Sequence, residues 1–189
     1  MIELADELPP GLARLVRKMV AVKLAIGAVA TIALPITFTL VVIFRYFLHA
    51  DLFAYEEWLL PIAFWLYFLG SSVGSYQDGQ IRADILETYL KTPKIKWWRR
   101  LVVGVLETAI LIVLVFWAGL TIMNDLSTYP FWQTTIALNI PYFIPHLAIF
   151  VGFAFMAFYS ALHLYVLLKA GPDPLRAVPD EPARTVAGG

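Results

Sequence analysis

Two adjacent carboxylates, Glu56 and Glu57, stand directly before a long apolar run in the segment YEEWLLPIAFWLYFLGSS, which covers residues 55–72. A carboxylate pair could act in acid–base catalysis, stabilise the start of a helix, or pair with a cation. The sequence holds no Gly-rich phosphate loop, Ser-His-Asp arrangement or metal-binding cluster to accompany them. We therefore expect no enzymatic activity. The pair is interpreted either as an interfacial cap or as a structural or partner contact.

Two more charged residues, Lys23 and Glu107, interrupt long apolar runs. A charge near the centre of a bilayer costs at least about 2.5–3.5 kcal/mol, so each side chain should face protein rather than lipid. Both are expected at a similar depth near the same membrane surface, and we predict that they pair. The alternatives for Glu107 are a contact with another subunit and a role in ion coupling.

The three histidines raise a haem hypothesis. His49 and His146 lie near one end of their apolar runs, whereas His163 lies near the opposite surface. Bis-histidine ligation needs one ligand from each of two helices at one depth. An interfacial histidine that bonds water is the better interpretation for these positions, so no cofactor is expected. Without cysteine, neither disulfides nor thiolate metal sites can form.

The elements that position these residues are four apolar runs. Of the 189 residues, 60% are hydrophobic and 15% are charged, whereas a soluble domain carries about 25% charged residues. A helix crosses the hydrocarbon with roughly 20 residues, and lipid-exposed backbone must satisfy its own hydrogen bonds. The sequence therefore predicts an all-α integral membrane protein with four transmembrane helices. The expected spans are 20–44, 58–76, 101–123 and 142–168.

Positive charge predicts the orientation of these spans. Of the fourteen Lys and Arg residues, all but Arg45 fall before or at the start of span one, between spans two and three, or after span four. Both termini are therefore expected in the cytoplasm. Arg45 lies at the same level as Glu56 and Glu57 at the outer surface, and an ion pair with Arg45 and a contact with a partner are the two alternatives for these acids. With a net charge of zero, the chain gives no indication of nucleic-acid binding.

The remaining segments divide the chain. We expect an amphipathic cytoplasmic helix within residues 1–19, a membrane domain over 20–168, and a disordered cytoplasmic tail over 169–189. A second amphipathic stripe follows span two at about residues 81–90. The polar outer loop 124–141 could dock an external protein.

Small residues and prolines mark two contact candidates. Gly70 and Gly74 form a G-x-x-x-G pattern in span two, which favours close packing of helices in lipid. Pro141 and Pro145 flank the start of span four and would set its angle.

The order of motifs resembles a known family. Arg45 ends span one, Glu56 and Glu57 open span two, and that span closes in FLGSS. A DGQIRADIL segment, a basic loop and an IPYFIP segment before span four follow. Over about residues 15–168 this resembles the small membrane subunit of tripartite ATP-independent periplasmic (TRAP) transporters, the DctQ-like family. Asp84 matches an aspartate of the family pattern, whereas Gln80 stands where the family usually has a histidine.

The resemblance implies a function. In such systems a periplasmic binding protein captures a solute, often an organic acid, and a large membrane subunit imports it with a sodium gradient. The small subunit braces the large one in a bacterial or archaeal inner membrane and helps to form the docking surface for the binding protein. The near absence of polar residues at mid-membrane agrees with a brace rather than a carrier. A haem-binding membrane anchor of a redox enzyme and a free-standing small transporter remain alternatives.

Overall fold

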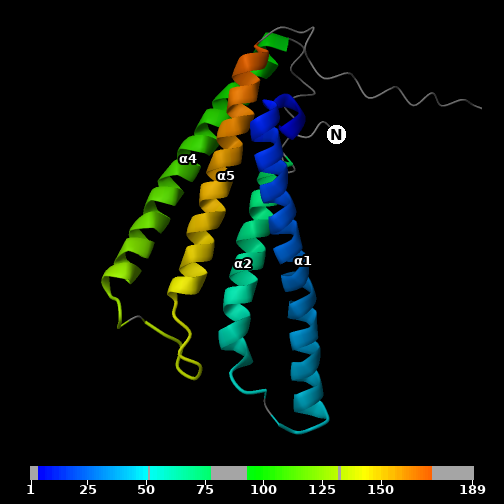
Figure 1. Ribbon diagram of the computed structural model, residues 1–189, viewed down its shortest axis with the longest axis vertical. Helices are drawn as coiled ribbons and strands as arrows, with labels where there is room; N and C mark the ends of the chain where they lie inside the picture. The colour runs from blue at the N-terminus through cyan, green and yellow to red at the C-terminus, as the bar shows by residue number, and fades with distance from the viewer. Residues whose placement is uncertain (1–3, 51, 78–92, 132, 172–189) are drawn as a thin grey trace, which may run out of the picture.

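The four expected spans form four long helices in the computed structural model, which describes residues 4–50, 52–77, 93–131 and 133–171 (Figure 1). A short 3-10 helix, η1, precedes them. The elements are η1 (Leu4–Glu7), α1 (Pro10–Tyr46), α2 (Tyr55–Tyr76), α4 (Pro93–Ser127) and α5 (Phe143–Ala170). The expected spans lie within these helices, except that span 142–168 begins one residue before α5. Each helix is apolar and long enough to cross a membrane, which confirms the fold class.

The helices differ in length. At 1.5 Å per residue, the 37 residues of α1 rise about 55 Å and the 22 residues of α2 about 33 Å. The amphipathic stretch around residues 12–19 was expected as a separate surface helix, but it forms the first turns of α1. The reason is local: residues 12–26 contain neither proline nor glycine, so nothing breaks the helix between the amphipathic stretch and span one.

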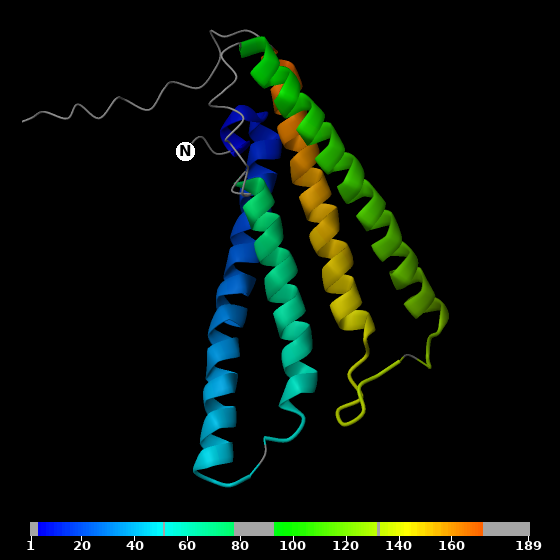
Figure 2. The same ribbon diagram turned by 180° about the vertical axis from the view of Figure 1, so that it is seen from behind.

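Side by side, the helices run in the order α1, α2, α5, α4, as both views show (Figures 1 and 2). The α1–α2 connection and the α4–α5 connection lie at one end, here called the loop end. The other end, here called the termini end, carries η1 and the last turn of α5. Toward the loop end α4 leans away from α1, so the helices are closest together at the termini end.

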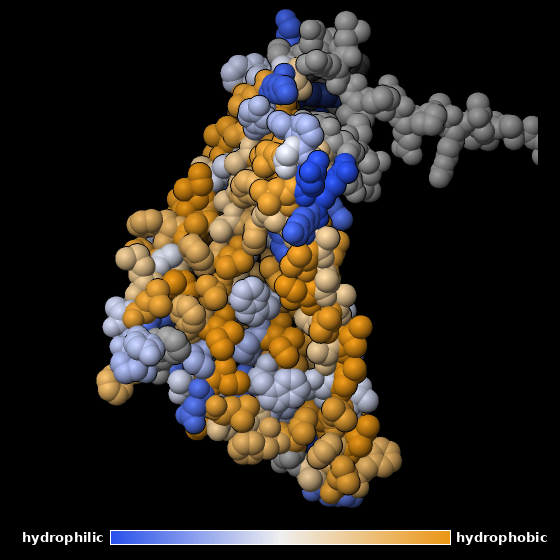
Figure 3. All heavy atoms as spheres, viewed as in Figure 1, coloured by the Kyte–Doolittle hydropathy of each residue, from blue (hydrophilic) through white to orange (hydrophobic). Residues whose placement is uncertain are grey.

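The packed core lies at the termini end and joins three of the four helices. Its buried members are Leu4, Ala5, Leu8, Val16, Val20, Val73, Tyr76 and Tyr159. The N-terminal segment thus covers a core built by α1, α2 and α5. Away from this core the helix surfaces are apolar and exposed, as lipid-facing helices are. Figure 3 shows a hydrophobic band over the middle of the molecule, with the most hydrophilic residues gathered toward its two ends.

Two helices approach closely at Gly152 of α5. A Cβ at this position would lie 2.6 Å from Phe68 Cβ of α2, so only glycine allows this contact. Gly70 and Gly74, expected to pack closely, make no such approach within the described part of the chain, because a Cβ at either would meet nothing there within 4 Å. Close packing of α2 therefore depends on a glycine of the neighbouring helix.

A Gly152→Ala substitution should lower the thermal stability of the purified chain in detergent. Forcing a methyl group against Phe68 overpacks the α2–α5 contact, which costs about 1–3 kcal/mol. Gly70→Ala is the matched control, because it adds the same methyl group to open space. Equal melting temperatures for the two variants would contradict the close contact.

Candidate interaction site

Glu57 links two segments that are far apart in the sequence. It lies in the first turn of α2, and its carboxylate accepts hydrogen bonds from two backbone amides of the α4–α5 connection. Oε1 accepts from Ala137 N at 2.8 Å and Oε2 accepts from Leu138 N at 2.7 Å. Both oxygens of one carboxylate are therefore used to hold a loop that lies 80 residues further along the chain.

The segment that Glu57 holds is a narrow reversal of the chain. Thr135 N donates to Ile140 O and Tyr142 N donates to Gln133 O, each at 3.0 Å. The hydroxyl oxygen of Thr135 in turn accepts from Ile140 N at 3.0 Å. We call residues 133–142 the loop hairpin. The two amides that Glu57 binds lie at its tip, so the carboxylate satisfies donors that the hairpin itself leaves unpaired.

The loop hairpin displays one apolar side chain. Ile136 is 98% exposed, although its neighbour Thr135 is buried. Hydrogen bonds on both sides of Ile136 fix the backbone, so this exposure belongs to an ordered tip. Ile136 is therefore an ordered and fully exposed apolar side chain at the loop end.

Arg45 does not form the expected ion pair. Arg45 and Glu56 are both exposed, and no described residue pairs with either of them. Glu57 is already satisfied by two amides of the loop hairpin, which explains why it needs no cation. The alternative with Arg45 is thus not formed among the described residues, and the two adjacent acids have different environments.

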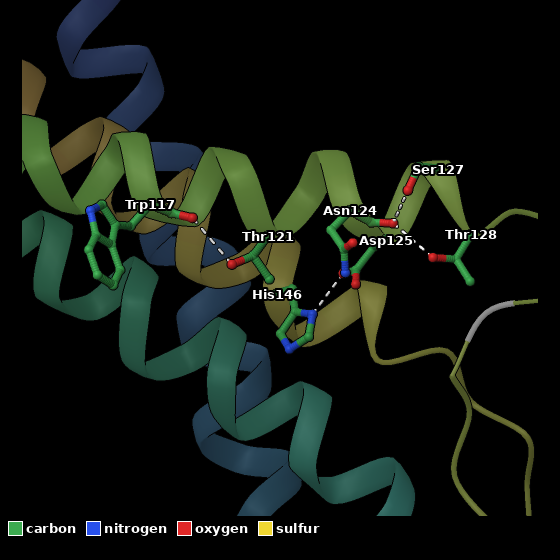
Figure 4. A network of polar contacts seen from close by, with 7 residues as sticks. All are labelled: Trp117, Thr121, Asn124, Asp125, Ser127, Thr128 and His146. Atoms are coloured by element: carbon green, nitrogen blue, oxygen red, sulfur yellow. Dashed lines mark hydrogen bonds and ion pairs between the residues drawn. The ribbon is translucent and has the colours of Figure 1, made fainter.

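A second link joins α4 to α5 at the loop end (Figure 4). His146 Nδ1, in the first turn of α5, lies 2.7 Å from Asp125 Oδ2, near the end of α4. The hydroxyls of Ser127 and Thr128 donate to the carbonyl of Asn124, which satisfies an acceptor at the end of that helix. His146 therefore bonds a carboxylate, where the sequence predicted water. Sequence reasoning overlooked Asp125, although its place at the end of the preceding helix is a usable signal.

Prolines and a further histidine also lie at helix ends. Pro141 forms an isolated antiparallel bridge with Thr134, and Pro145 is buried in the first turn of α5. Both therefore flank the start of α5, as the sequence indicated.

His163 Nε2 lies 3.1 and 3.2 Å from the carbonyls of Ser75 and Tyr76, the last residues of α2. His49 is exposed after α1.

Lys23 forms the polar centre of the bundle. Its side chain is 5% exposed, and Nζ donates to the Tyr159 hydroxyl at 2.7 Å and to Ser72 Oγ at 3.2 Å. The ammonium also lies 4.0 Å from the centroid of the Phe155 ring, within the range of a cation–π contact. Ser72 donates its own proton to Leu69 O at 2.7 Å. One lysine of α1 therefore binds α2 and α5 without a carboxylate.

The predicted pair of Lys23 and Glu107 is not formed. Helix α4 packs chiefly against α5, and α2 and α5 lie between α1 and α4. Glu107 is partly exposed on α4 and has no partner among the described residues. The prediction was based on similar depth in the membrane, but the order of the helices separates the two side chains.

Some predictions fall outside the described residues. Asp84 and the second amphipathic stripe lie within 78–92, and most of the expected tail lies within 172–189. Sequence reasoning also overlooked Ser72 and Tyr159 as partners of Lys23. A serine or tyrosine within an apolar run gives no indication of which side chain of another helix it contacts.

Four apolar helices, each long enough to cross a membrane, define the class as a multi-pass integral membrane protein. Residues 34–170, more than two thirds of the chain, match the family described as tripartite ATP-independent periplasmic transporters, DctQ component.

The chain therefore belongs to the DctQ family and is a TRAP transporter small membrane subunit of the inner membrane. A comparison with curated proteins found no match. Lys23 lies outside the matched range, whereas Ser72 and Tyr159 lie within it.

Replacing Glu57 with alanine should loosen the loop hairpin. Loss of two charge-assisted hydrogen bonds should raise hydrogen–deuterium exchange at the amides of Ala137 and Leu138 by about tenfold. Mass spectrometry of the detergent-solubilised chain measures this exchange. Glu56→Ala is the matched control, since no described residue bonds its carboxylate. Equal exchange in the two variants would show that Glu57 does not hold the loop.

A double-mutant cycle tests the junction at Lys23. Tyr159→Phe removes an acceptor from a buried ammonium and should cost about 1.5–3 kcal/mol in the presence of Lys23. In a Lys23→Met background the same change should cost much less, which gives a coupling energy of at least about 1 kcal/mol. Denaturant unfolding in detergent measures all four proteins.

Tyr165→Phe is the control for this cycle, because Tyr165 is on the same helix and is 52% exposed. Strictly additive effects of the Lys23 and Tyr159 substitutions would rule out the bond between them.

Proposed function

We propose that this chain acts as the scaffold subunit of a binding-protein-dependent, sodium-driven secondary transporter that imports a small organic acid. In this proposal the large membrane subunit carries the solute, and a periplasmic binding protein delivers it. Membership of the DctQ family supports this assignment. The proposed role of the chain is to brace the large subunit and to offer part of the surface on which the binding protein docks.

The observation that best supports the scaffold role is that the buried polar groups of the spans bond one helix to another. Lys23 bonds Tyr159 and Ser72, and the Thr108 and Ser160 hydroxyls lie 3.0 Å apart between α4 and α5. Transport sites usually combine interrupted helices with unsatisfied polar groups at mid-membrane. In the described part of this chain the four helices are continuous, and these buried groups join helix to helix. Such an arrangement favours a rigid brace.

The charge distribution supports an orientation. With all Lys and Arg residues except Arg45 assigned to the other side, the loop end faces the periplasm and both termini face the cytoplasm. The loop hairpin then projects toward the binding protein, with Ile136 at its tip. A bacterial or archaeal cytoplasmic membrane fits both the family and this orientation.

Gentle extraction of the tagged chain, followed by reconstitution, tests the proposal. A larger polytopic protein should co-purify, and sodium-dependent uptake should require this chain, the large subunit and the binding protein together. Ile136→Asp should leave the yield of the complex unchanged. It should raise the binding-protein concentration needed for half-maximal uptake by about tenfold, because the exposed apolar side chain that the binding protein would cover is lost.

Ile95→Asp serves as the control, since Ile95 is an exposed isoleucine near the start of α4 at the termini end. Uptake by vesicles that contain only this chain would contradict the scaffold role and favour a free-standing transporter. A Soret band that co-purifies with the chain would instead favour the redox anchor.

A further inference from the structure

Glu107 is the charged residue in the membrane-spanning part of α4, and the described part of its own chain leaves it unsatisfied. It lies within the apolar run of residues 101–123 and borders a shallow depression on α4. The other residues that line this depression are Val103, Leu106, Ile110 and Leu111. None of these side chains can donate a hydrogen bond, and no described residue bonds the carboxylate of Glu107.

The polar groups nearest in the fold are already engaged. Thr108 and Ser160 bond each other across the α4–α5 contact, and the Thr108 hydroxyl also donates to Gly104 O at 2.7 Å. Lys23 of α1 is bonded to Tyr159, and α2 and α5 lie between α1 and α4. An ionised carboxylate left facing hydrocarbon is strongly unfavourable. The carboxylate of Glu107 therefore needs a hydrogen-bond donor from another molecule.

The surroundings of Glu107 have the pattern of a helix-packing surface. Val103, Glu107 and Ile110 follow an i, i+4, i+7 spacing, which places them on one face of α4. Helix α5 covers the neighbouring face, where Thr108, Leu111 and Ala118 are buried. The face with Val103 and Ile110 is open, since these residues are 49% and 60% exposed. We call Val103, Leu106, Glu107 and Ile110 the Glu107 face.

We infer that the Glu107 face binds a helix of the large membrane subunit, and that this helix presents a basic side chain to the carboxylate. The inference rests on the proposed function, because it takes the large subunit as the partner. It adds which surface of the chain makes the intramembrane contact and what chemistry the partner supplies.

Charge complementarity favours a different protein over a second copy of this chain. The expected spans 20–44, 58–76, 101–123 and 142–168 contain one lysine or arginine, Lys23. That side chain is 5% exposed and bonded to two hydroxyls. A second copy therefore offers no accessible cation to Glu107 from these spans, whereas a larger polytopic partner has additional helices that can do so.

Photo-crosslinking with matched positions tests which face is covered. p-Benzoyl-phenylalanine is placed at Val103 or Ile110 on the Glu107 face, and at Val105 or Ile112 on another face, in the tagged chain co-expressed with the large subunit. The pairs are matched in type and exposure, with Val103 at 49% against Val105 at 47%, and Ile110 at 60% against Ile112 at 58%. Positions 105 and 112 lie about 140–160° around the helix from Glu107.

Adducts with the large subunit are expected from positions 103 and 110, at several times the yield from 105 and 112. Equal yields, or adducts mainly from 105 and 112, would overturn the inference. Adducts of 103 and 110 with a second copy of the chain, or with lipid alone, would overturn it as well.

Substitution of Glu107 provides an independent measurement. Glu107→Leu should reduce the co-purified large subunit about three- to tenfold, in line with the strength of polar contacts between membrane helices. Glu107→Gln should lower the yield much as Glu107→Leu does, because a neutral amide cannot form an ion pair with a basic side chain. Full retention of the complex by Glu107→Gln would contradict a basic partner. Ala109→Leu is the control, because it introduces the same leucine at an exposed position of similar depth on another face of α4.

The proposed function and this inference fail differently. If the unsubstituted chain co-purifies no large subunit, the proposed function and the inference both fall. If the unsubstituted complex forms and Glu107→Leu leaves its yield unchanged, only the inference falls and the scaffold role stands.

Discussion

Hydrocarbon offers no hydrogen-bond partner, and this constraint decides where each polar side chain of this subunit can lie. The buried Lys23 ammonium is the clearest case, because it is held by the Tyr159 and Ser72 oxygens and by the face of the Phe155 ring. These groups come from α2 and α5, so satisfying one lysine also fixes three helices relative to one another. The packed core forms around the same point, where Val20 and Tyr76 are buried.

At the loop end, hydrogen bonds of a charged side chain order a connection between helices instead of joining helices inside the bundle. Glu57 uses its carboxylate to bind two amides of the loop hairpin, so a connection that would otherwise be free has a defined tip. The bond between His146 and Asp125 holds the bases of that connection together. The molecule thus joins a tightly packed termini end to an ordered loop end, an arrangement that suits the proposed scaffold between two protein partners.

The sequence was sufficient for the four helices, because continuous apolar runs have few alternatives in a bilayer. Family motifs such as Glu56 and Glu57 also indicated the right class of protein. The partners of individual side chains were harder to predict. Arg45 and Glu107 were assigned partners from depth alone, and depth does not reveal which helices are neighbours. Gly152 was overlooked for a similar reason, since its importance depends on Phe68 of another helix.

The Lys23 junction also bears on how the protein is made. Lys23 and Tyr159 are 136 positions apart, so the first helix meets the membrane long before the last one is synthesised. During that interval the ammonium lacks its strongest acceptor, and α1 cannot adopt its final packing. The N-terminal segment, which covers a core that includes Tyr159, must wait as well. The two ends of the chain therefore complete the fold together, and biogenesis of the subunit finishes only when α5 has entered the membrane.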